Sequence, residues 1–483
     1  MARPRVRALP LALALVGLAA AGTAAAYLLR QSRDVTTTSE RAWRLYHEGV
    51  ENDLKMYERE AMSSYAEALR YDPHFAMAIL RLAEKMRARD PDRAKSLLAS
   101  AARERDSLNP REQLLLSIYE ERWGPRDMKR IESLIDEYVR RFPKDPEGYR
   151  MRADLLASTG RTQEAIAEYE RLVAVNPNYA IAYNAMGYYW ASKGDYARAE
   201  DYLKRYRFLA PSDANPYDSL GELWAHTGRY DEAEEVLKKA LAIKGDFFAS
   251  FGHLGTVALG RGDYAQAAEW FRKAANETDQ TETRYNFRLY AAVMLVDAGR
   301  ADEAVREMDA EAGEVALLPD SLEARRVRGQ VALRRAALLG RLGRTAEADK
   351  ILAGIDLGVF RDEKDPERNA SIDKDVKLIR GIIASGAGRD SEAVALLRDS
   401  LDRKDDKGLG ATEYFPAQYF ERMTLARSLG RLGKTDEASE ALAPILKQNP
   451  RFAPALEMLA RIRGEKPAST AAAAPARRAP GVS

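Results

Sequence analysis

The chain has 483 residues, with 76 lysines and arginines against 74 aspartates and glutamates, so its formal net charge is only +2. A nucleic-acid-binding surface is usually marked by a clear basic excess, so we expect no nucleic-acid partner. The absence of cysteine excludes disulfides, thiolate metal ligands and cysteine nucleophiles.

The first residues have the pattern of an export signal. Arg3, Arg5 and Arg7 precede an uncharged run from Ala8 to Leu29. As a helix this run would be about 33 Å long, enough for a hydrocarbon core of about 30 Å, and the arginines favour a cytoplasmic N-terminus. We predict a cytoplasmic basic stub (1–7) and a transmembrane signal-anchor (8–29). A signal peptide cleaved at the small residues 24–26 stays open as the alternative.

After a linker at residues 30–41, a repeat becomes visible. Gly160, Gly194, Gly228 and Gly262 follow one another at steps of 34 residues (194 − 160, 228 − 194, 262 − 228). Two further columns keep the same step, namely Ala165, Ala199, Ala233 and Ala267, and Tyr149, Tyr183, Tyr217 and Phe251. Three columns with one period indicate a repeat architecture in which each unit buries its apolar face against its neighbours.

Each unit is predicted to be a pair of helices. In the unit from Tyr183 to Pro211, apolar residues recur at helical steps, and Gly194 interrupts them where the first helix must end. Ala199 and Leu203 share one face of the second helix, which Pro211 ends. Small residues such as Gly187 indicate that the two helix backbones approach closely.

This unit resembles a tetratricopeptide repeat, whose signature is W-x2-L-G-x2-Y, A-x3-F and P. The residues that carry the resemblance are Met186-Gly187, Trp190, Ala199, Leu203 and Pro211. The resemblance implies an all-α, right-handed superhelical solenoid of stacked antiparallel helix pairs. Members of this family bind partners of many kinds and have no catalytic chemistry in common. The array is also similar to those attached to bacterial membrane receptor kinases and cyclases, without the catalytic domain. One departure is Arg152, where an apolar residue is usual.

The spacing divides the array into two regions. Residues 42–281 form the regular repeats. Residues 282–452 keep the pattern with longer repeats, because Gly299, Gly343, Gly388 and Gly433 are 44 or 45 residues apart. Two explanations of the longer step stay open, namely longer helices or inserted loops. We expect any inserts to lie at 362–374 and 402–412. Residues 453–464 are predicted to form a capping helix, and the tail from 465 to 483 lacks an apolar period and is predicted to be disordered.

No pattern in the sequence indicates an enzyme. The four histidines, His47, His74, His226 and His253, do not form a pair at metal-ligand spacing, and no phosphate-binding loop or nucleophile elbow is present. We therefore expect no catalytic residue, cofactor or metal.

The first helix of each pair lines a concave groove in the family that the repeats resemble. Residues at four-residue steps on its groove side share one helix face. The candidate partner-binding residues are Arg150, Asp154, Asn184, Tyr188, Ser192, Asp218, Glu222, His226 and Thr256. Simple solvation of an exposed helix face is the alternative. A lysine–asparagine clamp for a C-terminal carboxylate is disfavoured, because Asp154 replaces the asparagine, and Asp218 with Glu222 indicate a basic partner.

Together these patterns predict a non-catalytic, membrane-anchored scaffold whose exported solenoid docks proteins or peptides in its groove. The alternative is a peptide- or glycan-sensing module that signals through a membrane partner. We expect a single-pass protein of the bacterial inner membrane with its C-terminal body in the periplasm or outside, or a secreted periplasmic protein if the signal is cleaved. The sequence leaves the oligomeric state open.

Overall fold

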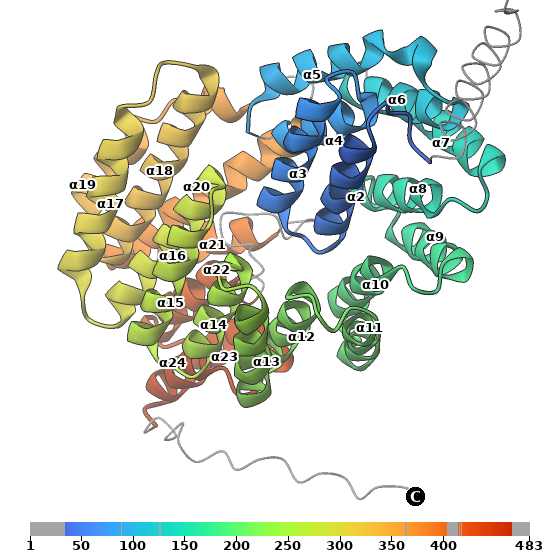
Figure 1. Ribbon diagram of the computed structural model, residues 1–483. Coiled ribbons are helices and arrows are strands. Elements are labelled where there is room, and N and C mark those ends of the chain that lie inside the picture. The colour runs from blue at the N-terminus through green and yellow to red at the C-terminus, as the bar shows by residue number, and fades with distance from the viewer. Residues whose placement is uncertain are drawn as a thin grey trace, which may run out of the picture. The chain divides into compact units, whose positions relative to one another are not determined.

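A computed structural model describes residues 34–87, 89–124, 127–362, 365–402, 414, 416 and 418–465 (Figure 1). In these ranges the regular secondary structure is helical, with no strand. No helix within them is long and apolar enough to cross a membrane. The predicted span at 8–29 and nearly all of the predicted tail lie outside the described residues, so the structure does not test them.

The chain divides into two compact units between Tyr189 and Trp190. In the first unit consecutive helices pack as pairs, with α2 on α3, α4 on α5, α6 on α7 and α8 on α9. Its helices are α2 (Glu40–Leu54), α3 (Glu58–Tyr71), α4 (Ala76–Met86), α5 (Pro91–Arg103), η1 (Arg105–Ser107), α6 (Pro110–Trp123), α7 (Met128–Arg141), α8 (Pro146–Ser158) and α9 (Thr162–Val175). The division falls within α10 (Ala180–Ser192).

The second unit continues the pairing with longer members. Its helices are α11 (Tyr196–Leu209), α12 (Asn215–His226), α13 (Tyr230–Ile243), α14 (Phe248–Gly260), α15 (Tyr264–Glu277), α16 (Thr281–Asp297), α17 (Ala301–Ala316), α18 (Leu322–Arg341), α19 (Thr345–Ala353), η2 (Leu357–Phe360), α20 (Pro366–Gly386), α21 (Asp390–Leu401), α22 (Tyr419–Arg431), α23 (Thr435–Gln448) and α24 (Ala453–Arg463). The stretch 362–374 therefore belongs largely to α20, so a longer helix replaces the predicted loop there. Residues 403–413 lie outside the described part.

The turn glycines have the conformation that the repeat pattern predicts. In both regions the glycine between the two helices of a pair has a positive φ, as in Gly160 (φ 77°) and Gly433 (φ 72°). A side chain would be strained in this left-handed region, so glycine is required to end one helix and reverse the chain. The other turn glycines of the series also have a positive φ, namely Gly194, Gly228, Gly262, Gly299, Gly343 and Gly388.

The second unit folds back on itself. The Asn449 side chain donates to the carbonyl of Ala225 at 3.2 Å and accepts from the Tyr230 hydroxyl at 3.2 Å. Arg451 donates to the carbonyl of Gly228, and α24 packs against α14 and α22. Figure 1 shows α23 and α24 beside α13 and α14. The predicted terminal helix is therefore present as α24, but its apolar face lies against earlier helices of the same unit.

Candidate binding groove

A groove of about 350 Å³ lies in the first unit. The apolar part of its lining, which we call the apolar wall, includes Val50, Leu54, Met56 and Ile181. The polar part of the lining, which we call the polar floor, includes ion-paired side chains from α4, α6 and α8. A groove with both polar and apolar lining suits an extended peptide, because the peptide groups need hydrogen-bond partners and the side chains can pack on the apolar part. A purely apolar ligand would leave the polar lining without partners.

Glu147 of the polar floor is the shared ion-pair partner of two arginines. Arg150, one turn further along α8, donates to both of its carboxylate oxygens, from Nη2 at 2.7 Å and from Nε at 3.0 Å. Arg81 of α4 donates to Oε1 at 3.0 Å from the other side. Burial by itself would raise the pKa of Glu147, but the charges of Arg150 and Arg81 outweigh burial and hold that pKa well below its ordinary value. The carboxylate is therefore charged and rigidly held.

Two further ion pairs complete the floor. Lys85 lies 2.6 Å from Asp53, which also accepts a hydrogen bond from the Tyr65 hydroxyl. Arg111 donates to Asp145 at 2.6 Å. Because each of these cations already has a carboxylate partner, the floor favours a ligand with hydrogen-bonding groups over one with a large net charge.

The start of the described chain lies along one end of the groove. Thr36 donates its backbone N–H and its hydroxyl to Glu112, and the Thr37 hydroxyl and the Thr38 N–H donate to Asp72. These bonds fix the segment Asp34–Thr38, whose Asp34 and Val35 line the groove. A hydrogen bond from His47 is the main reason why the pKa of Asp34 is lowered to about 2.

The four predicted binding residues of the first unit lie in different environments. Arg150 lines the groove, and Asp154 supports it by accepting from Arg150 Nη1 at 2.6 Å and from the Tyr169 hydroxyl. On α10, Asn184 is half-buried and Tyr188 is exposed. Whether any of the four binds a partner stays a prediction.

The predicted strip in the second unit is largely buried, so the expectation of an exposed polar face is wrong there. Asp218, Glu222 and Thr256 are 2%, 8% and 3% exposed. Asp218 accepts from Ser250 and contacts His253 at 3.0 Å, and the Thr256 hydroxyl donates to the carbonyl of Tyr414, whose ring packs against His253 at a tilt. Later parts of the chain cover this face. Ser192 is exposed and His226 half-buried.

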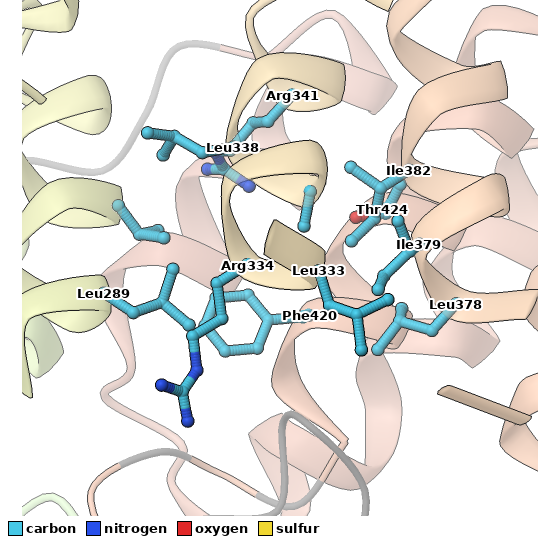
Figure 2. Close-up of a pocket in the computed structure, with 12 residues that line it drawn as sticks. Leu289, Leu333, Arg334, Leu338, Arg341, Leu378, Ile379, Ile382, Phe420 and Thr424 are labelled. Atoms are coloured by element: carbon cyan, nitrogen blue, oxygen red, sulfur yellow. The ribbon is translucent and has the colours of Figure 1, made fainter. Parts of the chain in front are cut away.

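The inner side of the second unit also contains a small apolar cavity of about 50 Å³ between α16, α18, α20 and α22. Figure 2 shows Leu333, Leu338, Ile379 and Phe420 among the side chains that line it, while the guanidinium of Arg334 points away from them. This volume fits the tip of one side chain and is too small for a peptide, so the groove of the first unit is the better candidate. Within the described ranges, no cluster of three or more histidines and carboxylates has metal-site geometry.

The sequence reading missed most of the groove floor. Arg81, Glu147, Lys85 and Arg111 lie outside the strip that it followed. One signal was present, since Glu147 and Arg150 are three residues apart and therefore share a helix face. Their pairing with Arg81, which is 66 residues away from Glu147, depends on how α4 and α8 stack.

Comparison with known families gives matches along the repeats. Family models described as tetratricopeptide repeat match residues 132–173, 150–214 and 423–481, residues 217–244, and residues 250–273. No curated protein sequence matches the chain.

Among solved structures, the chain is similar to PilW, a type IV pilus biogenesis factor, with 19% identity over 42% of this chain and 94% of that chain and a TM-score of 0.36. PilF of Pseudomonas aeruginosa gives 16% identity over 46% and 96% with a TM-score of 0.34. YrrB, described as a TPR protein with an unusual peptide-binding site, gives 18% identity over 36% and 89% with a TM-score of 0.28.

Proposed function

The chain carries tetratricopeptide repeats, a family of protein-interaction scaffolds, and from this premise we propose that it docks a partner peptide in the groove of its first unit. Arg81, Glu147 and Arg150 form the floor that would contact the peptide, and Val50, Leu54 and Met56 form the apolar wall. The role is one of binding and assembly, without catalysis.

The observation that carries this proposal is the pairing of an apolar wall with a rigid polar floor in one groove. Its volume of about 350 Å³ falls in the range of about 300–1,000 Å³ that ligand sites occupy. Apolar side chains of a peptide would pack on the wall. Its amide groups would meet the carboxylates and guanidinium groups, which the ion pairs hold in place before binding, so that little ordering entropy is lost.

Photocrosslinking in intact cells tests the proposal. A photoreactive residue replaces Met56, which lines the groove and is 56% exposed, and in a matched variant it replaces Met128, which is 39% exposed and lies outside the groove. We expect a defined partner segment to crosslink at position 56 and not at position 128, and mass spectrometry of that segment identifies its sequence. A synthetic peptide of that sequence should then bind the purified protein.

An Arg150→Ala variant gives a second test of groove binding. It removes a side chain that lines the groove and leaves the photoreactive position unchanged. We expect it to weaken binding of the synthetic peptide by at least about tenfold, the effect of losing one charge-assisted hydrogen-bonding group. Equal crosslinking at positions 56 and 128, or full peptide affinity in the Arg150→Ala variant, contradicts groove binding.

We also propose that residues 8–29 anchor the protein in a bacterial inner membrane, with the repeats on the periplasmic side. The uncharged run and the arginines that precede it support this. Alkaline extraction of membranes should leave the full-length protein in the pellet, and protease added to the periplasm should digest the repeats. Release of a shortened protein into the soluble fraction would instead indicate a cleaved signal peptide.

A further inference from the structure

Among the four 34-residue repeats formed by α8 to α15, two columns contain a charged residue in one unit only. Arg152 occupies the column that holds Leu220 two repeats later, and Glu168 occupies the column that holds Val236 (220 − 152 and 236 − 168 are both 68, two periods of 34). Leu220 and Val236 belong to one apolar cluster. In the repeat formed by α8 and α9, an arginine and a glutamate therefore replace an apolar pair.

A polar pocket of about 470 Å³ is present at this place, bordered by α7, α8 and α9. The buried side chains of Ile135, Leu155 and Leu156 line it together with three arginines and four carboxylates. None of these residues lines the groove around Arg150, so the two sites are separate.

The charged groups of the pocket are already paired. Arg152 donates to Asp136 at 2.6 Å and its other terminal nitrogen lies 3.5 Å from Glu168 Oε2. Glu168 Oε1 accepts from Arg171, and Arg161 donates to Glu132 and Glu164. Because every arginine has a carboxylate partner, entry of a strongly anionic ligand would have to break ion pairs, and a cationic one would meet three arginines.

One donor and one acceptor remain. Arg152 Nε and Glu168 Oε2 are buried, and neither has a hydrogen-bond partner among the described residues. The Glu168 side chain is only 8% exposed. Buried polar atoms are normally satisfied by protein, water or ligand, and here the two unsatisfied atoms belong to neighbouring side chains that face one pocket.

We propose that this pocket binds a small, neutral, polyhydroxylated molecule of the monosaccharide class. A hydroxyl group both accepts and donates a hydrogen bond, so one ring hydroxyl accepts from Arg152 Nε while it or its neighbour donates to Glu168 Oε2. The remaining hydroxyls meet the carboxylates of Asp136, Glu132 and Glu164 at the rim. A molecule without net charge leaves the five ion pairs of the pocket in place.

The test uses the full chain and the neutral probes glucose, galactose and N-acetylglucosamine, with acetate and putrescine as charged controls. Ligand-observed saturation-transfer NMR measures binding to the native protein and to the double variant R152L/E168V. This variant restores the apolar pair found two repeats later, so it should fold and fill the pocket. We expect saturable binding of at least one sugar to the native protein and at least about tenfold weaker binding to the variant.

A second variant, Glu168→Gln, keeps the size of the side chain and retains a hydrogen-bonding atom if the double variant does not fold. It should weaken sugar binding without abolishing it. No saturable sugar binding, which means that the pocket holds water only, overturns the proposal. So does undiminished binding in both variants, or preferential binding of acetate or putrescine. Because these outcomes do not involve the groove around Arg150, they leave the proposed peptide docking untouched.

Discussion

Arg150 holds Glu147 through both of its carboxylate oxygens, at 2.7 and 3.0 Å, one turn apart on the same helix. Arg81 adds a third bond from α4, which lies two repeats earlier. This pairing joins repeats of the first unit across the floor of its groove, so the stability of the unit and the proposed peptide binding involve the same side chains.

Replacement of Glu147 by glutamine should destabilise the first unit by about 3 kcal/mol at pH 7, because it leaves two half-buried arginines without their shared counter-charge. Urea unfolding measures the change. The matched control is Glu137→Gln, whose partner Arg141 is on the surface and 43% exposed. That control should change stability by less than about 0.5 kcal/mol. A similar loss in both variants would show that the buried pair has no special role.

The same pair predicts a pH dependence. The pKa of Glu147 is lower in the folded protein than its unfolded value of about 4.3, so the stability from its charge is fully present above that value. It is lost as the pH falls through the lower folded pKa. The difference between native protein and Glu147→Gln should therefore be constant from pH 8 to 5 and shrink in more acidic solution. Urea midpoints across this range check the sign.

Glu311 of the second unit should give a pH dependence of stability opposite in sign to that of Glu147. Burial raises its pKa to about 7, and neither of its carboxylate oxygens has a hydrogen-bond partner among the described residues. A raised folded pKa makes the native state less stable as the pH rises from about 4.3 through 7. Glu311→Gln should stabilise α17 and α18 by about 3 kcal/mol at pH 8 and by much less at pH 5. Hydrogen exchange of these helices at both pH values measures it, and equal protection in the two proteins contradicts it.

Close helix contact in the repeats predicts a contrast between two glycines. A Cβ on Gly221 of α12 would lie 2.6 Å from Leu237 Cγ, whereas one on Gly313 of α17 would meet nothing within 4 Å. Gly221→Ala should cost about 1–3 kcal/mol through overpacking. Gly313→Ala should instead stabilise the protein by up to about 1 kcal/mol, because alanine loses less backbone entropy in a helix. Thermal unfolding of the two variants distinguishes them, and a shift in the same direction for both refutes the argument.

Asn449→Ala should loosen the fold-back of the second unit. The side chain of Asn449 bonds to the carbonyl of Ala225 and to the Tyr230 hydroxyl, and both partners are buried. We expect faster hydrogen exchange in α24 and in the turn between α12 and α13, with no change in α2 to α9, since repeat arrays transmit stability mainly between neighbours. Uniform loss of protection in both units would contradict this.

The sequence by itself determined the repeat unit and its turns. Gly160 and the later turn glycines each end a helix through their own backbone conformation, and Gly221 is small because its own helix pair packs closely. Both requirements depend on residues that are near one another in the chain. They can therefore be predicted from the repeated 34-residue pattern alone. The longer step after Gln280 was also readable, although only the structure showed that the long helices α18 and α20 lie in the steps from Gly299 to Gly343 and from Gly343 to Gly388.

The tertiary structure decided which faces stay exposed. Arg150 lines a groove, while Asp218 and Thr256 from the same predicted strip are buried under later parts of the chain. That difference rests on contacts such as Tyr230 with Asn449, which are 219 residues apart. Such contacts form because small rotations between successive repeats add up over many helix pairs. No local pattern records the sum of those rotations, so the position of the groove follows only from the folded array.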